Sequence, residues 1–249
     1  MGNHDFFIRR GVKLKELYKI QVDEEGIFLE RPNRFIAHVQ LDNGSEEVVH
    51  VHDSGRIKEL LYEGNRVKIR RATNPNRKTN WDMISGRASD GEDILINSSF
   101  HRYISENLLN NFEISPFGKI DKLKAEVKYG KSRLDYLLEK DEKKIWVEIK
   151  GVSLAEDRVA MFPDAPSERA VKHLKELIEL KGLGDRAAVI LLVFRSSDIF
   201  RPRYETDPKF NEYFYKAISA GVEIYPIQLS LDNGIINYRG TIKIMDKID

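Results

Sequence analysis

The chain contains no cysteine, no apolar run long enough to cross a membrane, and almost no net charge. Without cysteine it can form neither disulfides nor thiolate metal sites, which is typical of proteins in a reducing cytoplasm. A transmembrane helix needs about 18 consecutive apolar residues, so we expect no membrane partner. The opening residues MGNHDFFIRR lack the apolar core of a secretion signal. These absences together predict a cytoplasmic protein.

The sequence also lacks the common nucleotide-binding motifs. It contains no phosphate loop of the G-x-x-x-x-G-K-[ST] kind and no dinucleotide fingerprint. This leaves little support for a sugar-metabolising enzyme that uses a nucleotide.

Positive charge is gathered in one stretch, although the whole chain is balanced. Lysine and arginine total 41, and aspartate and glutamate total 40. A balanced chain attracts a polyanion only where its cations cluster. Between residues 68 and 82 the cations outnumber the acids, and bases can stack on an aromatic residue while phosphates meet cations. The predicted nucleic-acid-binding residues here are Lys68, Arg70, Arg71, Arg77, Lys78 and Trp81. A solvated loop and a tryptophan inside a barrel are the alternatives.

The first part of the chain, residues 1–88, has the pattern of a small β-barrel. Residues 35–41 alternate apolar and polar side chains, a DNG turn follows, and the alternation resumes at 49–51. Residues 64–72 read as another strand, with a short helix or turn before them. Several short strands and one small helix favour a five-stranded OB-fold-like barrel, which we expect to bind nucleic acid.

The second part, residues 89–249, predicts an α/β domain with a C-terminal hairpin. A helix is expected over 99–112, with Tyr103, Ile104, Leu108 and Phe112 roughly on one face. Strands over 124–129, 133–138 and 145–150 precede a helix that ends near Gly182. The apolar run 187–194 reads as a strand covered on both faces, followed by another helix and strand. This run and the tail hairpin at 231–244 leave a sheet edge that could pair, so a homodimer is an open expectation.

Two carboxylates are expected to meet on neighbouring strands. Side chains alternate across a strand, so Glu148 and Lys150 share one face, and Asp135 converges with Glu148 if both apolar faces lie on the core. Adjacent carboxylates repel each other unless a cation lies between them. Mg²⁺ prefers oxygen ligands and is commonly held by one or two carboxylates. The pattern therefore predicts that Asp135 and Glu148 bind Mg²⁺ or Mn²⁺, with Glu126 as a further ligand or water-holder. The wet face of an ordinary sheet is the alternative.

A lysine two residues after the second carboxylate favours phosphodiester hydrolysis. Its ammonium can orient the attacking water and offset charge on the phosphorus, while a metal polarises the phosphoryl oxygen. The predicted catalytic residues are Asp135, Glu148, Lys150 and Glu126.

Longer stretches resemble the sugar fermentation stimulation protein A (SfsA) family. EVKYGKSRLDYLL and WVEIKGVSLAEDRVAMFPDAPSERAVKHLKELIEL carry the resemblance, and SGRIKELLYEGNRVKIRRA, NRKTNWDM and ILINSSFHRYISENLL lie in family order. The resemblance implies an OB fold followed by a PD-(D/E)xK nuclease-like domain, DNA binding, and an inferred nuclease role. Asp135, Glu148 and Lys150 match the nuclease motif, and Glu126 matches a family acid. In VHVHDSGRI the chain lacks the Cys-Pro-Asn segment that many members carry.

Further residues lie in family signature stretches, namely Arg133, Phe162, Pro163, Asp164, Glu168, Arg169, Lys172 and His173. Arg169 and His173 are one helical turn apart. We interpret their face, with Lys172 at its edge and Arg133 nearby, as one that meets the phosphates, the alternative being that His173 is an idle surface residue. His38, His50 and His52 could instead gather on one hairpin face and bind zinc, or simply form a polar barrel face.

These observations predict a DNA-binding protein, with RNA as the alternative ligand, that carries a divalent-metal nuclease-type site. The rival hypothesis is a non-catalytic DNA-binding regulator of sugar metabolism genes.

Overall fold

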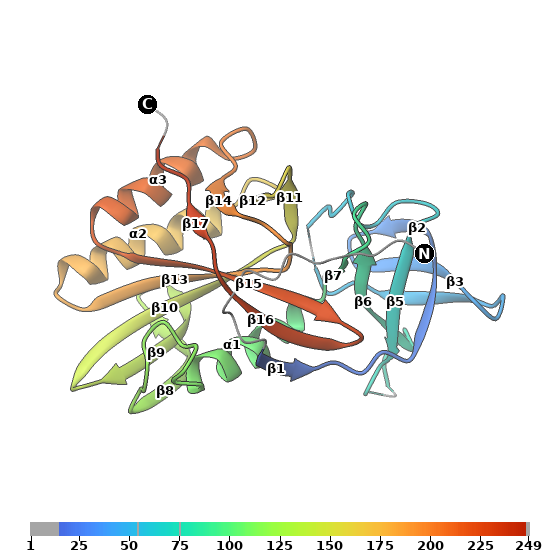
Figure 1. Ribbon diagram of the computed structural model, residues 1–249, viewed down its shortest axis with the longest axis horizontal. Helices are drawn as coiled ribbons and strands as arrows, with labels where there is room; N and C mark the ends of the chain where they lie inside the picture. The colour runs from blue at the N-terminus through green and yellow to red at the C-terminus, as the bar shows by residue number, and fades with distance from the viewer. Residues whose placement is uncertain (1–14, 54, 75, 248–249) are drawn as a thin grey trace, which may run out of the picture.

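The apolar alternation in the first part of the chain folds into a closed barrel. The computed structural model describes residues 15–53, 55–74 and 76–247. Six strands form the barrel sheet in the order β4-β3-β2-β5-β6-β7 (Figure 1). The first five close into a barrel through a parallel pairing of β4 with β6, and short β7 extends the sheet beyond β6. The six strands are β2 (Glu24–Asn33), β3 (Ile36–Leu41), β4 (Glu46–His50), β5 (Arg66–Arg71), β6 (Trp81–Arg87) and β7 (Asp93–Leu95). The predicted OB-type barrel is confirmed.

The barrel interior is made by alternate residues of these strands, as the sequence pattern requires. Ala37, Val39 and Leu41 on β3 are buried and contribute to one large apolar cluster. Phe35 differs from the expected alternation, because it lies in the turn before β3 and is 53% exposed. Trp81 is only 3% exposed and belongs to the barrel core, so it fills the interior as the alternative interpretation proposed.

The second part of the chain, joined by β1 from the first part, forms a seven-stranded mixed sheet in the order β1-β16-β15-β13-β10-β9-β8. Its strands are β1 (Lys15–Lys19), β8 (Lys122–Tyr129), β9 (Ser132–Lys140), β10 (Lys143–Val152), β13 (Arg186–Val193), β15 (Glu223–Asp232) and β16 (Ile235–Thr241). β10, β13 and β15 run parallel, and the outer pairs are antiparallel. A small sheet, ordered β11-β12-β14-β17, lies beside it and consists of β11 (Leu154–Glu156), β12 (Val159–Phe162), β14 (Ile199–Pro202) and β17 (Lys243–Ile244).

Helices cover both faces of the large sheet. α2 (Glu168–Gly182) and α3 (Pro208–Ser219) pack side by side on one face (Figure 1). The 3-10 turn η1 (Ser98–Phe100) and α1 (His101–Asn110) lie on the other face, where α1 contacts β1 and β10. In α1 the buried face is Ile104, Ser105, Leu108 and Leu109. Tyr103 and Phe112, expected on that face, are 50% and 64% exposed.

Two strands belong to a different sheet from the one that their position in the sequence suggests. β1 precedes the barrel in the chain, yet it pairs with β16 at the edge of the large sheet. β7 follows residue 88, yet it pairs with β6 of the barrel. The apolar run does not leave the expected pairing edge, because β13 lies between β10 and β15 and is buried on both faces. Among the described helices, none is long and apolar enough to span a membrane.

Candidate active site

Asp135 and Glu148 come together where β9 and β10 separate. The β9–β10 ladder pairs Tyr136 with Val147, and the same register continued by one step places Asp135 opposite Glu148. The regular ladder ends there, and Asp135 Oδ2 accepts a hydrogen bond from the backbone N–H of Ile149 at 2.7 Å. Both carboxylates line one cavity of about 440 Å³, between α1 and the beginning of α2.

The two oxygens of Glu148 have different surroundings. The side chain is 2% exposed, and Oε1 accepts hydrogen bonds from Lys150 Nζ and from His173 Nδ1. Burial by itself would raise the pKa of Glu148, but the ammonium of Lys150 and the hydrogen bond from His173 outweigh it and lower the pKa. Oε2 is buried and has no hydrogen-bond partner among the described residues. The charged form is therefore favoured, with one oxygen unsatisfied.

Asp135 has the opposite electrostatic character. Burial, followed by repulsion from Glu148, raises its pKa to about 6. An acid with a raised pKa beside one with a lowered pKa is typical of two carboxylates that compete for charge in one site. A cation would relieve this repulsion, and the unsatisfied Oε2 of Glu148 offers it a ligand, so the residues present fit Mg²⁺ or Mn²⁺.

Glu126 and Arg133 lie at the edge of this site. Glu126 lines the cavity, and its backbone has φ +57, a left-handed conformation that is uncommon outside glycine and asparagine. It is exposed and forms an ion pair with Arg133 at 3.6 Å, and Arg133 is itself 63% exposed. The structure therefore brings Glu126 to the cavity and Arg133 to its outer side.

The beginning of α2 supplies a cation to the cavity. Ser167 caps the helix by accepting a hydrogen bond from the N–H of Ala170 at 3.2 Å, as the sequence predicts. Arg169 is exposed and lines the cavity. Lys172 points away toward Glu176, at 3.8 Å. His173, expected to meet phosphates or to lie idle on the surface, is 3% exposed and holds Glu148 instead.

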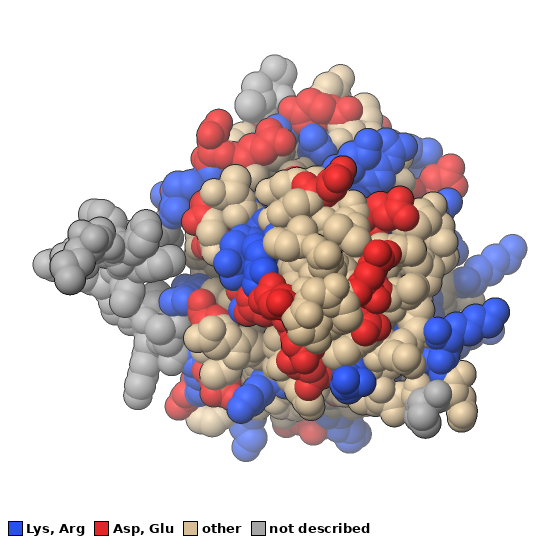
Figure 2. All heavy atoms as spheres, turned by 90° about the vertical axis from the view of Figure 1, so that its right-hand side faces the viewer, with Lys and Arg blue, Asp and Glu red and all other residues tan. Residues whose placement is uncertain are grey.

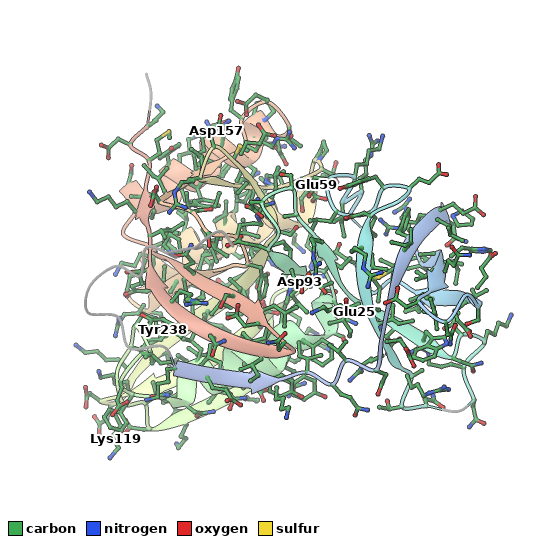
Figure 3. The ribbon with its side chains drawn as sticks, turned by 45° about the vertical axis from the view of Figure 1, so that its right-hand side comes forward. Glu25, Glu59, Asp93, Lys119, Asp157 and Tyr238 are labelled. Carbon is green, nitrogen blue, oxygen red and sulfur yellow. The ribbon has the colours of Figure 1, made fainter. Side chains whose placement is uncertain are left out.

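The predicted cationic stretch is largely neutralised by ion pairs with nearby acids. The side chain of Lys68 is 10% exposed and pairs with Asp93 at 2.7 Å and Glu25 at 3.4 Å. Figure 3 shows these two acids near each other, where the barrel meets the second domain. Buried and doubly paired, Lys68 is not available to a phosphate.

Arg70 and Arg77 also form ion pairs with a buried acid. Both contact Asp82, at 3.5 and 2.7 Å, and Asp82 is 1% exposed. The guanidinium of Arg71 lies over the buried ring of Trp81, 4.5 Å from its centroid. A ring covered in this way cannot stack with a base, so the predicted role of Trp81 is wrong.

Arg71 and Lys78 remain the exposed cations of this stretch. Positive and negative side chains are interspersed on the barrel side of the molecule, with uncharged residues between them (Figure 2). The barrel therefore presents no broad cationic face in that view.

The three histidines of the hairpin do not form a zinc site. His38 contacts Glu46 at 3.0 Å, while His52 contacts Asp82 at 2.9 Å. The rings of His50 and His52 are neighbours, with centroids 4.5 Å apart. Across the described ranges no group of three or more His, Asp or Glu side chains is placed to hold a metal ion. A cation at the cavity would thus have two close carboxylates from the protein and would draw its remaining ligands from water or substrate.

His101 and Arg102 line the cavity but are not among the site residues predicted from the sequence. His101, the first residue of α1, lines the cavity with Lys150. Nothing local to the sequence marks it, because its position depends on how α1 packs against β10.

The chain is a two-domain protein in which a closed OB barrel precedes an α/β domain, whose cavity is lined by two acids, Asp135 and Glu148. Residues 29–96 match the SfsA N-terminal OB domain, and residues 99–234 match the sugar fermentation stimulation protein RE domain. The chain belongs to the sugar fermentation stimulation protein (SfsA) family.

Relatives and a solved structure agree with this assignment. The sugar fermentation stimulation protein homolog of Thermosipho melanesiensis is 40% identical over 93% of this chain and 99% of its own. That of Methanococcoides burtonii is also 40% identical, over 91% and 94%. The structure of Pyrococcus furiosus SfsA in complex with Ca²⁺ superposes with a TM-score of 0.84 at 30% identity, covering 93% of this chain and 100% of that one.

Proposed function

We propose that this protein hydrolyses phosphodiester bonds of DNA with the help of a divalent metal ion. The observation that carries the proposal is the buried, unsatisfied Oε2 of Glu148, on a side chain whose other oxygen is held by two donors. A buried carboxylate oxygen without a partner costs free energy. A cation shared with Asp135 removes that cost.

Asp135 and Glu148 would hold the ion, for which Mg²⁺ and Mn²⁺ are the suitable choices. When bound, such an ion polarises a phosphoryl oxygen and stabilises the leaving oxygen. Pyrococcus furiosus SfsA, which forms a complex with Ca²⁺, supports a site for a hard cation in this family.

The remaining cavity residues would bind and orient the substrate. Lys150 pairs with Glu148 and also lines the cavity, so its ammonium can contact a phosphate oxygen or hold the attacking water. Arg102 and Arg169 also line the cavity. One guanidinium group can donate two parallel hydrogen bonds to two oxygens of a phosphate. His173 hydrogen-bonds to Glu148 and would keep that carboxylate charged and in place.

The nucleic acid would contact cations around the cavity and the exposed residues Arg71 and Lys78 of the barrel. Each duplex phosphate neutralised lowers log K by about 0.9 per tenfold rise in salt. Binding should therefore be salt-sensitive for DNA, and for RNA if RNA is the ligand.

The test is incubation of the purified protein with DNA and RNA substrates in Mg²⁺, Mn²⁺ or chelator. We expect cleavage in metal and none in chelator, and we expect Asp135→Asn and Lys150→Ala to abolish it. Glu139→Gln, an exposed carboxylate on the same strand as Asp135, is the matched control and should cleave normally. Cleavage that survives in both active-site variants would come from a contaminant.

A non-catalytic DNA-binding regulator of sugar metabolism is the second candidate. It is favoured by the pairing of Lys150 with Glu148, which occupies the ammonium, and by the name of the family. A regulator should bind DNA equally well in chelator and in metal, and Asp135→Asn should leave that affinity unchanged.

A further inference from the structure

The cavity contains a histidine that the proposed function does not use. The ring of His101 stacks on the ring of Phe194, with centroids 5.4 Å apart and planes at 19°. Its backbone is fixed at the start of α1, where its N–H donates to the carbonyl of Ser98. The imidazole is therefore held on one side by an aromatic ring and lines the cavity on another.

The space for this ring exists because residue 151 is glycine. A Cβ atom at Gly151 would lie 2.2 Å from Cε1 of His101 and 2.8 Å from Nε2. Carbon atoms do not approach each other so closely, so any larger residue would displace the ring. Gly151 directly follows Lys150, and the missing side chain lets His101 pack against the catalytic segment of β10.

The imidazole has hydrogen-bonding capacity that the protein leaves unused. Within the part of the chain that the structure describes, no group hydrogen-bonds to either ring nitrogen. Burial, and then the nearby charge of Lys150, lower the pKa of His101 to about 4. The ring is therefore neutral at pH 7, with one N–H donor and one acceptor nitrogen. His101 is half-buried and lines the cavity, so a ligand bound there can supply the partner that its ring nitrogens lack.

We propose that His101 is a further catalytic residue, whose ring N–H donates a hydrogen bond to an oxygen of the phosphodiester bound beside Lys150. The inference rests on the proposed function and adds a contact to it. A phosphodiester carries acceptor oxygens and a negative charge, which suits a donor placed near an ammonium. A fixed neutral donor contributes most when charge accumulates on the phosphoryl oxygens in the transition state.

The first test compares His101→Ala with Asn107→Ala, a control on the exposed face of the same helix. The substrate is the p-nitrophenyl ester of thymidine 5′-phosphate, in Mn²⁺. We expect His101→Ala to lower kcat by about 100- to 1,000-fold with little change in KM, and added imidazole to restore part of the loss. Asn107→Ala should match the unmodified protein. An unchanged kcat in His101→Ala would overturn the proposal.

The second test uses the glycine. Gly151→Ala keeps the imidazole but pushes it from its place, so it should reduce kcat about as much as His101→Ala. In the double variant the ring is absent and the added methyl group has room, so its kcat should equal that of His101→Ala alone. Losses that multiply in the double variant would show that Gly151→Ala acts on the strand, and the argument from the packed ring would then fail. Thermal unfolding of each variant checks that it is folded.

The histidine contact and the proposed hydrolysis of DNA can be tested separately. If the unmodified protein hydrolyses DNA and His101→Ala does so equally well, the histidine contact is wrong and the proposed function stands. If the unmodified protein hydrolyses nothing, the proposed function is wrong. The contact is then judged by imidazole NMR signals during titration with the dinucleotide dTpdT in chelator. A shift of the His101 signal supports the contact, and an unmoved signal removes it.

Discussion

Replacing Asp135 by asparagine should stabilise the metal-free protein at neutral pH while it abolishes cleavage. Burial and the charge of Glu148 raise the pKa of Asp135 from 3.8 to about 6. A carboxyl group whose pKa is higher in the folded state opposes folding once it is charged. That cost is absent below about pH 3.8, grows as pH rises, and is complete above about pH 6. The difference between the two pKa values corresponds to about 3 kcal/mol.

The asparagine side chain retains the oxygen that accepts the N–H of Ile149, so this hydrogen bond can persist. Coupling to Glu148 and partial solvent access reduce the cost, so we expect a gain of about 1–3 kcal/mol in the free energy of unfolding at pH 7.5. Urea denaturation in chelator measures it, and the same experiment at pH 4.5 should show a much smaller gain.

Glu139→Gln is the matched control, because Glu139 makes an exposed pair with Lys122 at 2.8 Å. Such pairs contribute at most about 1 kcal/mol, so this variant should not gain stability. An Asp135→Asn gain of the same size at both pH values would refute the electrostatic argument, since it would have to come from packing.

Three further outcomes follow from the same contacts. His173→Ala should lower the free energy of unfolding by about 2–4 kcal/mol, because it removes a hydrogen bond to a buried carboxylate and leaves a cavity; urea denaturation should show His173→Gln, which keeps a donor, losing less. Mn²⁺ should raise the Tm of the unmodified protein but not of Asp135→Asn, as differential scanning fluorimetry would reveal. Lys78→Ala should reduce the salt dependence of DNA binding by about one phosphate contact, whereas Lys68→Ala should lower stability and leave that slope unchanged; an equal change of slope in both would contradict the buried pairing of Lys68.

Much of the fold could be predicted because its signals are local. Strict alternation in residues 36–41 and the unbroken apolar run of β13 each identify their element without knowledge of its neighbours. The assignment of β1 could not be predicted in this way, since its partner β16 lies more than two hundred residues away in the sequence. Tyr103 of α1 was expected on the buried face but is half exposed. Its ring stacks on Tyr18 of β1, with centroids 5.6 Å apart.

In the candidate site, too, some residues could be predicted from local sequence and others depend on tertiary packing. Asp135, Glu148 and Lys150 reach one cavity through strand alternation and register, which short-range sequence fixes. The roles of His173 and His101 depend on how two helices pack on opposite faces of β10, and no spacing in the sequence encodes that.

The prediction that the cations of residues 68–82 are available to nucleic acid overlooked their pairing with acids for a similar reason. Counting charges along the sequence cannot reveal that Lys68 meets Glu25 and Asp93, or that Arg70 and Arg77 share Asp82. A sequence count of cations overstates the charge that reaches a ligand wherever strands bring distant acids alongside.

If the site binds a metal ion as proposed, the surroundings of Glu148 give Lys150 and His173 a shared role. A fully buried carboxylate would ordinarily take up a proton, and a protonated acid is a poor ligand for a metal ion. Lys150 and His173 counter this by acting on the same oxygen, Oε1, and so leave Oε2 without a hydrogen-bond partner among the described residues. Had the two donors been divided between the two oxygens, the carboxylate would be equally charged but closed to a cation. The placement of both donors on one oxygen is therefore better suited to binding an ion than to stabilising the fold alone.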